Sequence, residues 1–82
     1  MIFEEFSLIE VKEKIGMLKP DRWLVNSYCE SKDYYRVQLA YSDTYRPIGI
    51  IDRNELEQAI DENKAEFVGM LKLKDRPKKE KQ

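Results

Sequence analysis

The sequence predicts a small α+β domain with the element order α-β-β-β-α-β. Its sheet is expected to have three to four strands, mostly antiparallel, with two helices on one face. Three observations support this class: a helical apolar period near the N-terminus, an alternating run in the middle, and a strand followed by a helix-start signal near residue 50. The 82 residues, 41% of them hydrophobic, fit one domain, which we place at residues 1–75.

A helix is predicted over residues 7–19. Ser7 and Glu10 have the spacing of a capping box, in which the two side chains satisfy free amides at a helix start. Pro20 disfavours helical geometry in the residue before it, so the helix should end near Lys19. Between these signals, apolar residues recur at three- and four-residue steps: Leu8, Val11, Ile15 and Leu18.

Three strands are expected to follow as an antiparallel meander. Residues 23–30 are rich in aromatic and β-branched side chains, and residues 34–41 alternate as a sheet with one buried face requires. The third strand, residues 47–51, begins with Pro47, where the missing amide costs least. The alternation gives the second of these strands an outward face: Tyr34, Arg36, Gln38 and Ala40.

A second helix is predicted over residues 53–64. Asp52 and Glu55 repeat the capping spacing, and Ile51 and Leu56 can form a hydrophobic staple around it. The face toward the sheet is expected to hold three apolar residues: Leu56, Ala59 and Ile60. The opposite face is acidic: Glu55, Glu57, Asp61 and Glu62.

The segment over residues 66–74 fits either a strand or a helix, and we favour a fourth strand. Gly69 weakens a helix interior by about 1 kcal/mol relative to alanine, and Lys72 and Lys74 would protect a sheet edge. No apolar residue remains from Arg76 onward, so residues 76–82 are expected to form a disordered basic tail.

Charge is distributed unevenly along the chain. Residues 72–82 hold six cations and two carboxylates, whereas the other residues hold nine cations and fourteen carboxylates. Cys29, the single cysteine, cannot form an internal disulfide and fits a reducing compartment. The N-terminus has no signal-peptide pattern, and no apolar stretch approaches the ~20 residues that cross a bilayer. We therefore expect a cytoplasmic protein without membrane contact.

The residue types needed for common reaction chemistry are scarce. The chain has no histidine, one thiol and no glycine pair resembling a phosphate loop. Its adjacent acids, such as Asp61 with Glu62, lack the spacing and turn glycine of an oxygen-ligand loop. We expect a protein that is not an enzyme, with no catalytic residue, no cofactor and no metal.

Protein binding is the function that the sequence favours. Five tyrosines and Trp23 lie on or beside the meander, and two helices can cover only one sheet face, so some rings should be exposed and available to a partner. We expect an adaptor, inhibitor or regulator, with a phage or mobile element as a candidate source. A homodimer stays open, because so small a core is thin. The predicted contacts lie on the outward strand face and the acidic helix: Tyr34, Arg36, Gln38, Glu57 and Asp61.

Nucleic-acid binding is the alternative. Arginines lie near tyrosines in sequence, and this pairing can stack bases and hold phosphates. The lysine-rich end of the chain would add phosphate affinity. The residues expected to contact nucleic acid are Arg36, Arg46, Lys78 and Lys79.

Two partial resemblances to known families accompany these predictions. The α-β-β-β-α order resembles double-stranded RNA-binding domains, but Asp52 and Glu55 stand where those domains carry a lysine-rich motif. Residues 46–56 resemble the strand-to-helix segment of CBS nucleotide-sensing domains, which implies adenine-nucleotide sensing as a third function. In those domains a threonine or serine and a later aspartate hold the nucleotide; here Asp52 and Glu55 occupy these places.

Overall fold

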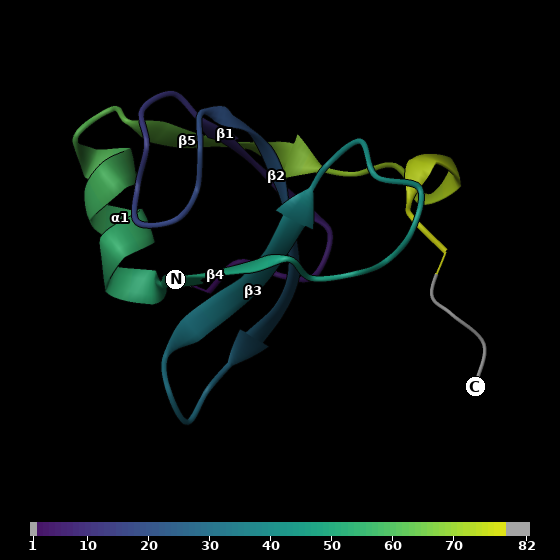
Figure 1. The fold of residues 1–82 in the computed structure, drawn as a ribbon, viewed down its shortest axis with the longest axis horizontal. Coiled ribbons are helices and arrows are strands. Elements are labelled where there is room, and N and C mark those ends of the chain that lie inside the picture. Colours follow the sequence, from purple (N-terminus) through teal and green to yellow (C-terminus); the bar gives the residue numbers. More distant parts are fainter. Residues whose placement is uncertain (1, 79–82) are drawn as a thin grey trace.

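The computed structural model of the chain describes residues 2–78 (Figure 1). These residues form a sheet of antiparallel strands, one α-helix and one short 3-10 helix. The elements in chain order are β1 (Ser7–Val11), β2 (Asp21–Cys29), β3 (Tyr34–Leu39), β4 (Gly49–Asp52), α1 (Arg53–Asp61), β5 (Ala65–Met70) and η1 (Leu73–Asp75).

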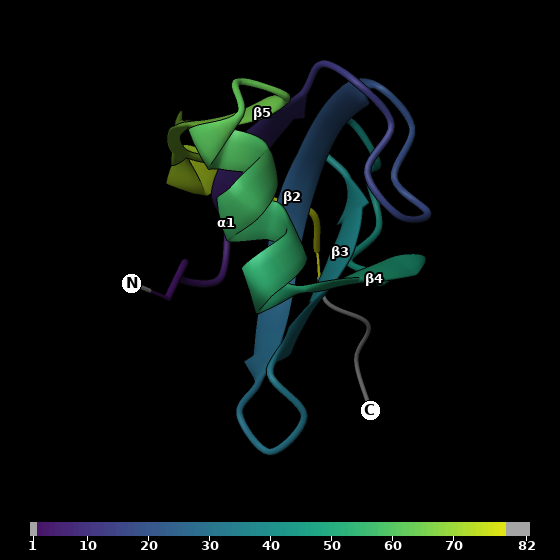
Figure 2. The same ribbon diagram turned by 90° about the vertical axis from the view of Figure 1, so that its left-hand side faces the viewer.

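The five strands lie in the order β4-β3-β2-β1-β5, with every neighbouring pair antiparallel. The first four strands form a meander, and β5 then pairs with β1, so the two ends of the chain meet in the sheet. Helix α1 joins the edge strands β4 and β5 and packs across the inner face of the curved sheet (Figure 2). The small α+β domain is confirmed, but the sheet has five strands rather than three or four, and the described residues contain one α-helix rather than two.

The helix predicted over residues 7–19 is wrong, because its first part is strand β1. Ile9 and Val11 are buried at alternate positions, and β1 lies between β2 and β5, so both of its edges are hydrogen bonded. Ser7 caps no helix; its hydroxyl donates to the Glu4 carbonyl at 2.7 Å. The buried residues of this segment also fit the strand period of two. Hydrogen bonding of β1 to strands on both sides then outweighs the local preference for a helix. Without this helix, the order no longer matches that of double-stranded RNA-binding domains.

The main core lies between the inner sheet face and α1. Leu56 and Ala59 of α1 are buried there, as predicted, and Ile60 packs at the margin. The Ile15–Leu18 turn, which follows β1, adds two more buried apolar side chains. The whole cluster comprises Ile9, Val11, Ile15, Leu18, Trp23, Val25, Tyr35, Val37, Ile51, Leu56, Ala59 and Ala65.

The outer sheet face is covered at one end, so the expectation of an open face holds for only part of it. Leu24, Asn26 and Gln38 are buried on this face beneath residues 40–48. The covering loop is tied down in turn by the C-terminal segment, through a parallel bridge between Thr44 and Lys78. A chain segment without regular structure thus occupies part of the place predicted to be free.

The other predicted elements are confirmed with shifted ends. Strands β2 and β3 lie close to their expected positions, whereas β4 begins two residues later than predicted and α1 ends at Asp61 instead of Lys64. The last predicted strand is β5, but it ends at Met70, so Lys72 and Lys74 lie beyond the sheet edge that they were expected to protect.

The described part of the predicted tail contacts the domain. The Arg76 guanidinium lies 4.4 Å from the centre of the Phe6 ring, and its Nε donates to the Leu71 carbonyl at 3.0 Å. Pro77 is buried. The disorder predicted for residues 79–82 concerns positions outside the described residues. In residues 2–78, no helix has the length and apolar character needed to span a membrane.

Candidate interaction surface

Tyr34 and Arg36 lie on the outer face of β3, as predicted. The Arg36 guanidinium is 5.4 Å from the centre of the Tyr34 ring and donates to the Tyr34 hydroxyl at 3.3 Å and to Ser27 Oγ at 3.4 Å. A guanidinium over an aromatic face is held in place but keeps donors available for another molecule. Arg36 is exposed and Tyr34 is half-buried, so both can be reached from outside the protein.

Gln38 follows on the same face but cannot contact a partner, so its predicted role is corrected. Its side chain is 1% exposed. Gln38 Oε1 accepts from Asn26 Nδ2 at 2.6 Å and from the Arg46 amide at 2.9 Å, while Nε2 donates to the Thr44 carbonyl at 2.9 Å. These bonds anchor the loop over residues 40–48 to the sheet. Gln38 was expected to be exposed because its side chain is polar; instead, that side chain forms hydrogen bonds with buried backbone groups.

Exposed apolar side chains lie directly beside Arg36, along the edge strand β4. Ile50 is paired opposite Arg36 in the sheet, and Met17 lies close enough for its sulfur to accept from the Ile50 amide at 3.3 Å. Met17, Ile48 and Ile50 are each about half exposed. They border a shallow hollow of about 430 Å³ together with Arg36, Pro47 and Gly49. We call Tyr34, Arg36, Met17, Ile48 and Ile50 the β4-edge surface.

The sequence analysis missed the apolar part of this surface. Ile48 and Ile50 alternate with the buried Ile51, so the period of two alone could have placed both on the outer face. Met17 carried no such signal, because it reaches β4 from the turn between Ile15 and Leu18, which was predicted to be helical.

The two groups of predicted contacts do not form one site. Glu57 lies on α1, which covers the inner sheet face, and its carboxylate accepts from Arg53 Nη1 at 3.0 Å. Asp61 is exposed at the C-terminal end of the same helix. Tyr34 and Arg36 are on the outer face. A partner that contacts the outer face therefore does not reach the acidic helix through the sheet.

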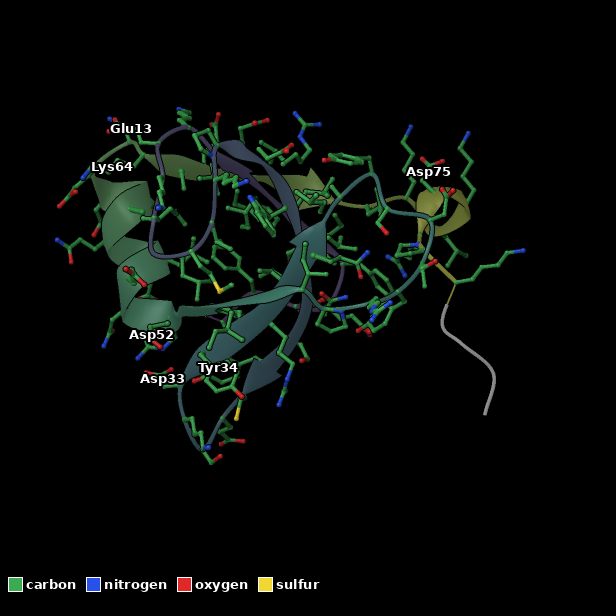
Figure 3. All side chains as sticks on the ribbon, in the orientation of Figure 1. Glu13, Asp33, Tyr34, Asp52, Lys64 and Asp75 are labelled. Carbon is green, nitrogen blue, oxygen red and sulfur yellow. The ribbon has the colours of Figure 1, made fainter. Side chains whose placement is uncertain are left out.

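Asp33, Arg53 and Tyr28 form a polar cluster where the β2–β3 hairpin meets the start of α1; Figure 3 labels Asp33 near Tyr34 and Asp52. Arg53 Nε donates to Asp33 Oδ1 at 2.6 Å and Nη2 donates to Oδ2 at 2.9 Å. The Tyr28 hydroxyl donates to the same carboxylate. The Arg53 hydrogen bonds hold the pKa of Asp33 below its usual value, and the bond to Asp33 raises the pKa of Tyr28. These hydrogen bonds connect the hairpin to the start of α1.

Three of the five tyrosines, Tyr28, Tyr35 and Tyr45, make internal hydrogen bonds, and Tyr35 lies on the buried face on which the strand alternation placed it. Tyr35 is fully buried, and its hydroxyl accepts from the Phe3 amide at 3.0 Å. Tyr45 donates to Glu5 and to the Asn26 carbonyl, and burial together with the Glu5 contact raises its pKa to about 12. Tyr41, by contrast, is 69% exposed. Tyr34 and Tyr41 are the tyrosines that a partner could readily contact.

The predicted nucleic-acid contacts are partly brought together. The amide of Tyr45, next to Arg46, donates to the Lys78 carbonyl at 3.2 Å, so the loop carrying Arg46 lies beside the C-terminal segment. A hollow of about 710 Å³ at this end is bordered by Tyr41, Lys74, Arg76 and Lys78, among other residues. Arg36 lies on β3, outside this hollow. Lys79 lies outside the described residues.

Cys29 has an ordinary structural setting. Its sulfur is half-buried and lies 3.6 Å from Ser31 Oγ. The contact with Ser31, followed by the Lys32 amide, lowers the pKa of the thiol. Within residues 2–78, no group of three or more cysteine or acidic side chains is arranged to hold a metal.

No model of a known protein family matches the chain, and no curated protein or solved structure is similar to it at a significant level. Neither resemblance noted in the sequence is therefore supported by a family match. What this domain does has to be argued from its surface.

Proposed function

We propose that this protein is a binding module that holds an extended segment of a partner protein along the β4-edge surface. The observation that carries the proposal is the juxtaposition of a cation, an apolar hollow and a strand edge that no other strand pairs with among residues 2–78. Arg36 lies opposite Ile50 in the sheet, the hollow beside them is lined by Met17 and Ile48, and the Met17 thioether is the acceptor for the Ile50 amide on this edge. This combination fits a module that acts as an adaptor, inhibitor or regulator rather than as an enzyme.

The outward edge of β4, which Met17 covers at Ile50, suits a peptide in strand conformation. An added strand gains affinity from main-chain hydrogen bonds and specificity from alternate side chains. The outward amide of Ile50 now donates only to a thioether sulfur, a weak acceptor, and a peptide carbonyl would replace it favourably.

The side chains around this edge define the chemistry of the partner segment. An apolar side chain would fill the hollow beside Met17 and Ile48, and a carboxylate next to it would pair with Arg36. We therefore expect an extended segment in which an aliphatic or aromatic residue lies beside aspartate or glutamate. A basic segment would meet Arg36 unfavourably.

Selection from a displayed library of random peptides tests this proposal without knowing the partner. Enriched peptides should share an apolar residue beside an acid, and Arg36→Ala or Ile50→Lys should weaken their binding by about tenfold or more. Val68→Lys, on the opposite sheet edge, is the control and should leave binding unchanged. Peptides that bind the Ile50→Lys and Arg36→Ala proteins as well as the wild type would overturn the proposal, as would the absence of any enrichment.

Nucleic-acid binding is a second candidate, supported by the gathering of Tyr41, Lys74 and Lys78 around one hollow. Its signature is affinity for labelled oligonucleotides that falls steeply with salt and weakens in Lys74→Glu/Lys78→Glu. Deleting the basic segment is a poor test, because Arg76 and Pro77 also pack against the domain. Anisotropy that stays flat at low salt would eliminate this candidate.

A further inference from the structure

The other edge strand of the sheet, β5, is apolar and only partly protected: a β-bulge lies at Val68, and the Phe3 ring stacks on Phe67 with 5.4 Å between the ring centres. Phe67, Val68 and Met70 are 44%, 40% and 42% exposed, and within residues 2–78 their strand pairs with β1 alone. Monomeric proteins usually guard such an edge with lysine, proline or a covering segment. The one charged residue within β5 is Glu66, whose carboxylate lies 3.6 Å from Lys12 Nζ of the same chain. The edge is therefore suited to contact with another strand.

Charge is arranged with opposite signs at the two ends of β5. Just before the strand, residues 52–64 carry five carboxylates against Arg53 and Lys64; just after it, residues 72–78 carry four cations against Asp75. In Figure 1, β5 runs from α1 at one end of the molecule toward η1 at the other.

We propose that two copies of this chain associate through antiparallel pairing of their β5 edges, forming a continuous ten-stranded sheet. Identical strands paired in this way are related by a two-fold axis, so the contact closes on itself. The six residues of β5 span about 20 Å. Because directly opposed residues of an antiparallel pair point to the same sheet face, the two-fold axis passes through one residue of the strand. An axis at Phe67 sets the Phe67 side chains of the two copies beside each other, which removes exposed apolar surface of the edge from water.

The charge pattern favours the antiparallel arrangement over the parallel one. Antiparallel pairing places the acidic end of α1, with Asp61, beside the partner copy's Lys72 and Lys74, and it does so twice. Parallel pairing would set acidic end against acidic end. A second copy is thus complementary to this edge in both apolar character and charge, and the β4-edge surface on the opposite side of the sheet stays free.

Sedimentation equilibrium of the full chain between about 10 μM and about 1 mM tests this inference. We expect a species of twice the 9.8 kDa chain mass that dissociates at high salt. Val68→Lys should raise the dissociation constant by about tenfold or more. Ile50→Lys places the same change on the other edge and should have no effect, and circular dichroism verifies that both variants fold.

Charge reversal identifies the pairing direction. Asp61→Lys and Lys74→Glu should each weaken the dimer by about threefold or more, and the double variant should recover wild-type affinity. A chain that stays monomeric to about 1 mM overturns the inference. So does a dimer that Ile50→Lys dissociates and Val68→Lys does not. Peptide binding at β4 is measured with separate variants, so either proposal can fail without the other.

Discussion

At the scale of single residues, Asp33 links the β2–β3 hairpin to the start of α1. Its carboxylate accepts two hydrogen bonds from Arg53, its carbonyl accepts the Arg53 amide at 3.1 Å, and its backbone has a φ of 58°. Aspartate and asparagine tolerate this left-handed geometry better than most residues. One residue thus combines a turn conformation with an ion pair, and neither feature depends on a partner.

Asp33→Asn should lower stability at neutral pH and have less effect in acid. Because Arg53 depresses the pKa of Asp33 in the folded state, the ionised carboxylate stabilises the fold above its ordinary pKa of 3.8, and this stabilisation is lost as pH falls through the lower folded value. Asparagine tolerates the same backbone geometry, but its amide nitrogen replaces one carboxylate oxygen, so the variant removes both the charge and one acceptor of the Arg53 and Tyr28 hydrogen bonds. Thermal midpoints of both proteins from pH 7 to about pH 2 should converge in acid; a constant difference would contradict this account.

Gln38→Leu should destabilise the domain by about 2 kcal/mol, because it leaves the Arg46 amide, the Thr44 carbonyl and Asn26 without a partner. Urea unfolding measures the change. The matched control is Arg36→Leu, the same replacement two positions away on the same face but at an exposed side chain, which should stay within about 0.5 kcal/mol. Equal effects would show that Gln38 does not anchor the loop.

At the scale of elements, the local sequence pattern predicted the correct structure where the apolar residues fitted either the strand period of two or the helical period of 3.6, but not both. The alternation of residues 34–41 predicted β3, and the combination of Ile51, Asp52 and Leu56 predicted the start of α1. Residues 7–11 fitted both periods, since Ile9 and Val11 alternate while Leu8 and Val11 are three apart. The choice between them depends on β5, more than fifty positions away in the chain, and no local signal contains that pairing.

The start of α1 offers a test of what the capping signal contributes. Asp52 occupies the cap position with an extended backbone, but its side chain makes no capping hydrogen bond. We expect Asp52→Ala and Asp52→Asn to cost the same, about 0.5 kcal/mol, because each removes only a charge near the helix N-terminus. Urea denaturation of the two variants gives the comparison. If asparagine retained stability and alanine lost about 1 kcal/mol, a side-chain cap would be present in solution.

At the scale of the whole molecule, residues 76–78 pack against the folded domain. Removing residues from Arg76 onward should lower the free energy of unfolding by about 1 to 2 kcal/mol, because the cation over Phe6 and the buried Pro77 are lost. A chain ending at Lys78 keeps all of these contacts and is the control. Chemical denaturation that gives the same midpoint for both truncations would show that the segment contributes nothing to stability.

The candidate site followed from sequence only in part. Tyr34 and Arg36 were placed correctly because strand alternation is a local property. Gln38 was misplaced because the loop over residues 40–48 covers that part of the outer face, where the Gln38 side chain bonds to buried backbone groups. The apolar half of the β4-edge surface comes from three segments: the turn with Met17, the loop with Ile48 and strand β4 with Ile50. Tertiary packing brings these segments together, and no local sequence pattern predicts it.

The pairing of β1 with β5 has a consequence for how the chain acquires its structure during synthesis. The ribosome makes β1 first, yet one side of this interior strand has no partner until β5 has been translated. During that interval a nascent chain exposes a hydrogen-bonding edge beside Ile9 and Val11, which attracts chaperones or other chains. Completion of the sheet is thus a late event, and its rate is governed by closure of the longest loop in the protein.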